Sequence, residues 1–139
     1  MPAQWALPTT FMIKTQLATL SIDDLTAELR LEAKTPAGLQ TVVLNTEGVK
    51  LTSDTVSVTI TPQSIELKHS GSTGTVAPEG ITLESGAASV KVTPAAIDIE
   101  NGAAGAHFTP TSIGLRNGAA SVDLSPTSVS LNDGALEVM

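Results

Sequence analysis

The stretch TPTSIGLRNGAASVDL at residues 109–124 decides the fold, because nearly the same sixteen residues precede it twice. Residues 93–108 read TPAAIDIENGAAGAHF, and residues 77–92 read APEGITLESGAASVKV. Counted from Asn45, the period continues without a gap through residue 139. A fixed period of this length is typical of repeat architectures, in which each unit is one small supersecondary structure.

Each unit contains two short segments in which apolar and polar residues alternate. In the unit at 109–124, the apolar pairs are Ile113 with Leu115 and Val122 with Leu124. A period of two with β-branched residues predicts half-buried strands, here about four or five residues long. Polar residues that alternate with the apolar ones are expected to face solvent, among them Asp98, His107 and Asp123.

Turn residues separate these segments. Proline stands at the second position of five units, and glycine stands at the tenth position of four units, after Ser, Asn or Asp. Such residues fix φ or accept positive φ, so they turn the chain sharply. Each unit is therefore predicted to hold two strands and two turns. The prolines are Pro62, Pro78, Pro94, Pro110 and Pro126, and the glycines are Gly86, Gly102, Gly118 and Gly134.

The composition favours a thin and regular core. The chain has 139 residues, of which 41% are hydrophobic but only 2% are aromatic, and there is no tyrosine. Aromatic side chains usually supply much of the buried area of a compact domain, so Val, Ile, Leu and Ala must fill this core. A pair of short strands is marginal alone and needs more strands or a second surface.

Charge and cysteine content narrow the possible functions. The formal net charge is −7 and basic residues are few and scattered, which argues against binding of nucleic acid. Without cysteine there is no disulfide, thiolate metal site or cysteine nucleophile. No apolar run approaches the roughly eighteen residues of a membrane-spanning helix, and no standard signal peptide is visible.

The sequence divides into three regions. Residues 45–139 form the repeat, which we expect to be a β-helix shaft that ends in a tip. Residues 25–44 fit the period poorly and are expected to form transitional strands; a helix at 22–34 is possible, but the leucine spacing favours a strand. Residues 1–24 carry large side chains such as Trp5 and are expected to be an adaptor or linker segment.

The repeat resembles the C-terminal triple-stranded β-helix, or β-prism, of spike proteins in contractile injection systems. Such spikes occur in the cell-puncturing devices of contractile phage tails and tailocins, and in the VgrG proteins of type VI secretion. The resemblance covers about residues 45–139 and rests on the turn glycines, the Thr-Pro steps and five apolar pairs. These pairs are Ile65 and Leu67, Ile81 and Leu83, Ile97 and Ile99, Ile113 and Leu115, and Val129 and Leu131.

The resemblance implies an all-β fold, an intertwined trimeric β-helix or β-prism of short strands with a 16-residue (2 × 8) repeat. Three chains would wind round one axis, and each octad would supply a strand to one face and then pass to the next face. The inward side chains of the homotrimer would fill a narrow core. The expected core residues are Ile65, Leu67, Ile81, Leu83, Ile97, Ile99, Ile113, Leu115, Val122, Leu124 and Val129.

The resemblance also implies a function and partners. The trimer would be the structural spike or needle of a contractile injection machine, located in a virion tail or in a secreted injection apparatus assembled in the bacterial cytoplasm. It would contact baseplate and tube components and, transiently, the target membrane that it punctures. A PAAR-type protein could cap the apolar tip, for which the candidate residues are Leu131, Leu136, Val138 and Met139.

Some features of that family are absent from this sequence. There is no hydrolase domain and no room for an upstream oligosaccharide-binding barrel. Some phage spikes end in a His-x-His motif that holds iron, but here the only histidines, His69 and His107, are far apart in the sequence. We therefore expect no metal at the tip and no cofactor.

No catalytic pattern is visible in the sequence, so we expect the protein not to be an enzyme. His107 has no partners arranged near it in the sequence and is expected to be an exposed structural residue. Asp23 and Asp24 could be half of a calcium site, but the loop spacing is missing, and a turn or helix cap is the simpler interpretation. No nucleophile elbow, phosphate loop or dinucleotide fingerprint occurs.

Three other interpretations share the repeat. A trimeric fibre or adhesin shaft would be a rigid spacer, although a fibre should carry a distinct head. A monomeric β-solenoid that binds a surface such as ice would need aligned threonine ladders, whereas the Thr-Pro steps lie at predicted turns. A stack of hairpins built on the Asn-Gly turns would change the fold but leave the protein non-enzymatic.

Overall fold

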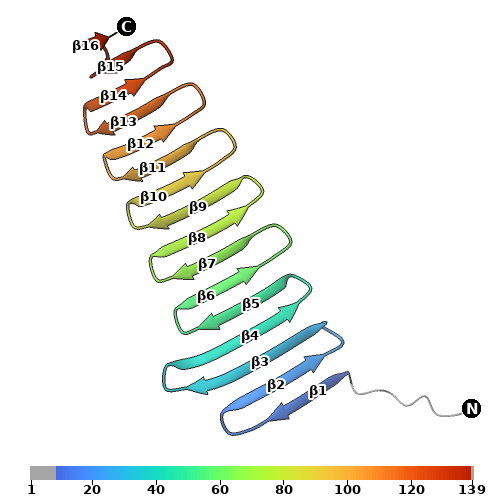
Figure 1. The fold of residues 1–139 in the computed structure, drawn as a ribbon. Coiled ribbons are helices and arrows are strands. Elements are labelled where there is room, and N and C mark those ends of the chain that lie inside the picture. The colour runs from blue at the N-terminus through green and yellow to red at the C-terminus, as the bar shows by residue number, and fades with distance from the viewer. Residues whose placement is uncertain (1–8, 139) are drawn as a thin grey trace, which may run out of the picture. The chain divides into compact units, whose positions relative to one another are not determined.

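A computed structural model describes residues 9–138 of the chain, and all the regular secondary structure in that range is β-strand. The chain divides into two compact units, Met1–Ser70 and Gly71–Met139, which we describe one at a time. Figure 1 shows the strands in chain order. The prediction of an all-β chain of short repeated strands is confirmed.

Unit 1 is an antiparallel meander in which each strand pairs with the next one along the chain. Its first strands lie in residues 10–23, upstream of the recognisable repeat. The strand predicted around residues 25–34 is present as β3, so the alternative of a helix at 22–34 is wrong. The strands are β1 (Thr10–Lys14), β2 (Ala18–Asp23), β3 (Glu28–Thr35), β4 (Gly38–Asn45), β5 (Gly48–Ser53), β6 (Val56–Ile60) and β7 (Ile65–His69).

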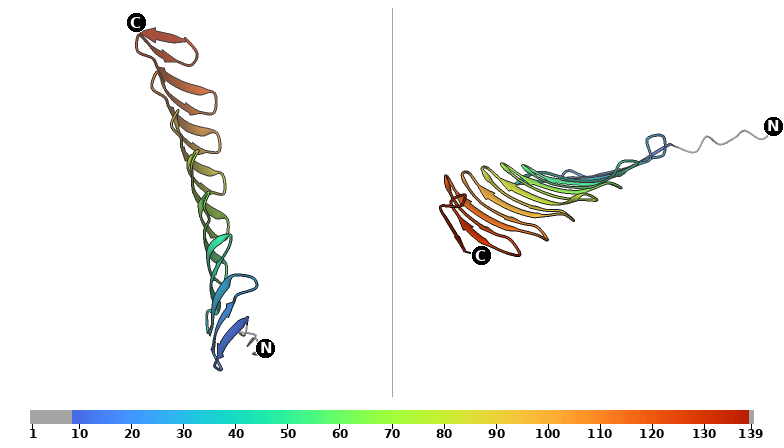
Figure 2. Two further views of the ribbon diagram at one scale, coloured as in Figure 1. Left: turned by 90° about the vertical axis from the view of Figure 1, so that its right-hand side faces the viewer. Right: turned by 90° about the horizontal axis from the view of Figure 1, so that it is seen from above.

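Unit 2 is a second antiparallel meander with the same nearest-neighbour pairing. Its strands form a single layer, as the views in Figure 2 show. Two strands correspond to one sixteen-residue period. The strands are β8 (Ser72–Ala77), β9 (Gly80–Ser85), β10 (Ala88–Val92), β11 (Ile97–Asn101), β12 (Ala104–Phe108), β13 (Ile113–Asn117), β14 (Ala120–Leu124), β15 (Val129–Leu131) and β16 (Leu136–Val138).

This pairing does not follow the path that the resemblance implied. Successive octads were expected to pass from one face of a trimer to the next, but here they are hydrogen-bonded neighbours in one sheet. The turns explain the difference, because they are hairpin turns that return the chain antiparallel to itself. Within each unit, the alternative of stacked hairpins describes the pairing.

The glycine turns form one edge of unit 2. Asn101 pairs with Ala104, so the β11–β12 hairpin closes on Gly102 and Ala103, and Gly102 has a φ of +60°. The backbone N–H of Gly102 donates to the carbonyl of Ala87 in the preceding turn at 3.3 Å. Since the equivalent bond recurs at the next glycine turn, successive turns extend the hydrogen-bond ladder of the strands.

The Thr-Pro turns form the opposite edge, and their hydroxyls are part of the turn. Thr109 Oγ1 accepts hydrogen bonds from the backbone N–H of Thr111 at 3.3 Å and of Ser112 at 2.9 Å. The N–H of Thr109 donates to the Ser112 carbonyl at 2.8 Å. This Ser/Thr turn therefore explains why a hydroxyl residue precedes the proline. Equivalent bonds occur at Thr61, Thr93 and Ser125.

A tighter turn replaces the Thr-Pro turn at two places. Gly80 follows the two-residue loop between β8 and β9 and has a φ of +148°. A Cβ at Gly80 would lie 2.1 Å from the Val92 carbonyl oxygen, so only glycine fits there. Gly48 occupies the equivalent position in unit 1, with a φ of +143° and an added Cβ 1.9 Å from the Ile60 oxygen.

Candidate functional site

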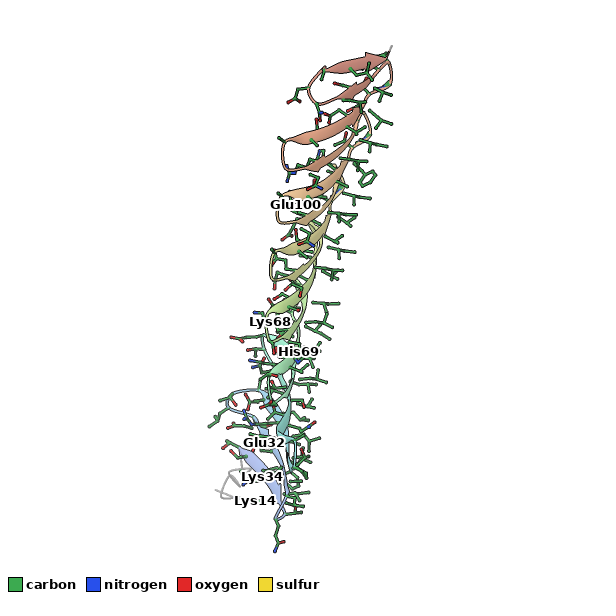
Figure 3. The ribbon with its side chains drawn as sticks, turned by 90° about the vertical axis from the view of Figure 1, so that its left-hand side faces the viewer. Lys14, Glu32, Lys34, Lys68, His69 and Glu100 are labelled. Atoms are coloured by element: carbon green, nitrogen blue, oxygen red, sulfur yellow. The ribbon has the colours of Figure 1, made fainter. Side chains whose placement is uncertain are left out.

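One face of the unit 2 sheet carries nearly all of its large apolar side chains, and we call it the apolar face. Cross-strand pairs place these residues in two parallel rows, because Ile97 pairs with Val92 and Phe108, while Ile99 pairs with Val90 and Ala106. Figure 3 shows hydrocarbon side chains on one side of the ribbon and polar ones, including Glu100, on the other. Row A is Val76, Ile81, Val92, Ile97, Phe108, Ile113, Leu124 and Val129, and row B is Gly74, Leu83, Val90, Ile99, Ala106, Leu115, Val122, Leu131 and Leu136.

The apolar face is open in the single chain. Ile113 is 38% exposed and Leu83 is 53% exposed, and no residue in the described part of the chain is fully buried. The accessible area of the chain is 10225 Å². A compact monomer of 14.2 kDa would expose about 6,800 Å² by the usual scaling of area with mass. The single chain therefore lacks the hydrophobic core that its apolar residues could form.

Unit 1 has an apolar face of the same kind, and it starts well before the repeat. Pairs of alternating apolar residues on β1 to β4 lie in register with those of the later strands; Ile22, for example, pairs with Phe11 and Leu29. Strands β3 and β4 lie where the sequence predicted transitional strands, at residues 25–44. Strands β1 and β2 were missed because their apolar pairs are irregularly spaced, although they alternate with polar residues in the same way. The residues are Phe11, Ile13, Leu20, Ile22, Leu29, Leu31, Val42 and Leu44, followed by Val49, Leu51, Val58, Ile60, Ile65 and Leu67.

All the residues predicted from the resemblance to form a trimer core lie on these apolar faces. The structure brings them together in rows but leaves them open, so their burial in a trimer stays a prediction. Of the candidate tip residues, Leu131 pairs with Val122 and Leu136, and Leu136 is 56% exposed. The side chain of Val138 and all of Met139 lie outside the described residues, as does Trp5.

The opposite face of unit 2 is polar and carries cross-strand ion pairs. Arg116 Nη2 donates to Glu100 Oε1 at 2.5 Å, and His107 Nδ1 contacts Asp98 Oδ1. Arg116 lies across Gly105 to reach Glu100, since a Cβ on Gly105 would be 3.2 Å from Arg116 Nε. The expected orientation of the His107 and Asp98 side chains away from the apolar face is therefore confirmed.

A shallow concavity of about 470 Å³ lies on this polar face. Gly105 and Gly114 form part of its lining, and the two ion pairs surround them. His107 and Arg116 are already paired with Asp98 and Glu100, while Asp123 and Asp133 also line the concavity and make no ion pair among the described residues. Within residues 9–138, no group of three His, Cys, Asp or Glu side chains could hold a metal ion.

The other candidate ligand, Asp23 with Asp24, is accounted for by a turn. Asp23 Oδ1 accepts hydrogen bonds from the backbone N–H groups of Leu25 at 2.9 Å and Thr26 at 3.3 Å. This is an Asx turn between β2 and β3. The structure thus gives these residues the structural role that the sequence favoured over a calcium site.

The comparisons with known proteins add no assignment. No protein-family model, no curated protein and no solved structure matches the chain. In the part of the chain that the structure describes, no helix has the length and apolarity needed to cross a membrane. The apolar face is therefore the feature of the chain on which a functional proposal can be built.

Proposed function

We propose that three copies of this chain associate through their apolar faces into a β-prism, and that the prism is the spike of a contractile injection machine. The observation that carries the proposal is the continuous apolar face of each unit, which is open in the single chain. The resemblance of the sixteen-residue repeat to injection-system spikes supports the function. The polar faces, with their acidic residues, would form the outer surface.

Burial of the open apolar face on association would lower the free energy of the protein substantially. Ile81 is 44% exposed and Leu115 is also 44% exposed in the single chain. Full burial of such a side chain contributes about 1.5–3 kcal/mol, so covering the part that remains exposed contributes about 1 kcal/mol each. Summed over the two apolar rows of a unit, the free energy of burial is on the order of ten kcal/mol, before the entropic cost of association is subtracted.

A further copy of the same chain is the occupant that matches the face. Each face is two side chains wide and repeats every two strands, so its partner must offer apolar rows of the same period along the same length. Another copy meets that requirement at every strand. Symmetric homo-oligomers are also the commonest soluble assemblies, because one surface then serves every subunit.

Strand length fits a closed triangle of three such sheets. A five-residue strand such as β11 spans about 17 Å. Three strands of that length enclose a triangle whose centre lies about 5 Å from each side, which is half the roughly 10 Å between packed sheets. Aliphatic side chains from three faces would then meet on the axis. Each chain would supply one face of the prism, in keeping with the pairing within the chain.

Sedimentation equilibrium on the purified full-length chain tests the assembly. We expect a single species of three times the 14.2 kDa chain mass. A monomer at micromolar concentration would refute both the prism and the spike. A dimer would indicate two sheets packed face to face instead of three round an axis.

Electron microscopy tests the function itself. Contractile particles would be isolated from the cells that encode the chain and labelled with an antibody against residues 71–138. We expect the label at the distal end of the tube, close to any PAAR-type tip protein and to the baseplate. Label on fibres that project sideways would instead support the fibre or adhesin shaft, and particles without label would contradict both functions.

A further inference from the structure

The repeat creates a difficulty for an assembly of identical copies. If one copy slides along another by sixteen residues, the apolar rows of β8 to β16 still face apolar rows. Sixteen residues are two strands, a shift of about 10 Å. Such a slip keeps the apolar side chains inside and the polar ones outside, so the alternation pattern does not distinguish the slipped arrangement from the in-register one. Closed rotational symmetry, in contrast, requires every copy to lie at the same height.

Two strands of unit 2 depart from the pattern: β8 carries Gly74 in row B, and β12 differs in both rows, which would distinguish the registers. On β12, row A carries Phe108, where the strands one period away carry Val92 and Leu124. Row B of the same strand carries Ala106. The largest side chain of the face thus stands beside one of its smallest, and Phe108 is the one aromatic residue of the unit.

The neighbours of this strand do not compensate for the exchange. Phe108 pairs across the sheet with Ile97 and Ile113, and Ala106 pairs with Ile99 and Leu115. These four partners are the ordinary isoleucine and leucine of the repeat. Compared with the other repeats, β12 therefore has extra side-chain volume at Phe108 and missing volume at Ala106. The two differences offset each other within β12, in the layer of the prism that this strand would share with the same strand of the other copies.

We propose that Phe108 and Ala106 form a register key that holds the copies of the prism at one common height. This inference rests on the proposed trimer. In register, three rings meet in a layer where three alanines leave room for them. A slip of one period would place the ring beside Val90 or Val122 of a neighbour, which overpacks one layer, and would leave a void at Ala106. Both effects oppose the slip.

The Ile methyl NMR spectrum of the full-length protein tests the key, because all eight isoleucines remain in every variant used. A threefold symmetric, in-register trimer gives one signal for each isoleucine. We expect this spectrum for the parent chain. For the variant Ala106→Val with Phe108→Leu, which restores the ordinary repeat, we expect additional signals from slipped registers at an unchanged trimer mass.

A transplanted key separates register from simple loss of packing. Val122→Ala with Leu124→Phe, added to the first pair of substitutions, moves the key by one period. We expect the spectrum to return to one signal for each isoleucine. A trimer whose spectrum stays single in Ala106→Val with Phe108→Leu would overturn the key, because the aperiodic strands of unit 1 would then suffice. Extra signals that persist after transplantation would overturn it too. A monomeric parent chain would instead remove the proposed function.

Discussion

The two faces of the unit 2 sheet differ in chemistry, yet both are open in the single chain. Ile81 on β9 is 44% exposed in the single chain, whereas the next residue, Thr82, is only partly exposed and points to the polar face. A soluble sheet normally hides its apolar side and leaves its polar side in water. The exposed apolar side is the reason for proposing that further copies of the chain cover it.

The largest expected effect comes from placing the same charge on each face in turn. Ile81→Asp would bring three carboxylates into one thin layer of the prism, at a cost of several kcal/mol per unpaired ion. Thr82→Asp places its carboxylate opposite Lys91, which pairs with Thr82 across the strands. We expect Ile81→Asp to abolish the trimer in sedimentation equilibrium, and Thr82→Asp to leave the mass and the melting temperature nearly unchanged.

The order of these two effects is itself the test. In a chain that functions alone, the more exposed position would tolerate the aspartate better, so Ile81→Asp would be the milder variant. Thermal unfolding monitored by circular dichroism gives the order directly. Equal melting curves for Ile81→Asp and the parent chain would show that nothing covers the apolar face.

The next largest effect concerns the two edges that bound these faces. Gly80→Ala would force a Cβ to within 2.1 Å of the Val92 carbonyl, so the β8–β9 turn must open; we expect about 4 kcal/mol or more of destabilisation. Gly118→Ala has a φ of +62° but open space around the new Cβ. There we expect only about 1–2 kcal/mol, the cost of a left-handed alanine.

Denaturant unfolding of the two glycine variants checks this difference. The midpoint should fall much further for Gly80→Ala than for Gly118→Ala. Similar midpoints would mean that the turn at Gly80 relaxes and that the variant loses stability only through dihedral strain. The close approach of the two backbones would then contribute nothing to the destabilisation.

The sequence alone predicts the strands and faces of the repeat, because alternation specifies both at once. Ile113 and Leu115 had to lie on one side of a strand, and Arg116 on the other. The pairing could not be predicted in this way. The same sixteen-residue period suits strands that pair within a chain and strands that pass between chains, and only the hairpin geometry of turns such as Gly102–Ala103 decides between them.

The features missed in the sequence have physical reasons. Strands β1 and β2 carry apolar pairs such as Phe11 with Ile13, but their irregular spacing hides them from a search by period. The contact of Arg116 with Glu100 joins residues sixteen positions apart, so it appears only when β12 is known to lie between their strands. The open state of the apolar face is a tertiary property that no alternation pattern contains.

A smaller effect is expected at the edge built from Thr-Pro turns. Thr109→Val keeps the shape of the side chain but removes the oxygen that accepts hydrogen bonds from Thr111 and Ser112. We expect a loss of about 1 kcal/mol, the usual net contribution of such bonds. Thr111→Val is the matched control, because its backbone N–H takes part in the turn and its hydroxyl makes no hydrogen bond among the described residues. Equal melting temperatures for the two variants would contradict this role of the Thr109 hydroxyl.

The smallest effect is expected on the polar face, at the pair of Arg116 and Glu100. Both side chains are about half exposed, 57% and 48%, so water and salt screen their attraction. A double-mutant cycle with Arg116→Gln and Glu100→Gln should give a coupling of about 0.2–1 kcal/mol that falls as salt is added.

The substitution Gly105→Ser sharpens this test. Other sixteen-residue repeats carry serine at this position, Ser89 for example, and a serine here would occupy the space over which Arg116 lies. We expect the coupling to vanish in the Gly105→Ser background while the trimer persists. A coupling that survives there would show that Arg116 reaches Glu100 by another path, and a coupling above about 2 kcal/mol would mean that this face is also covered in the assembly.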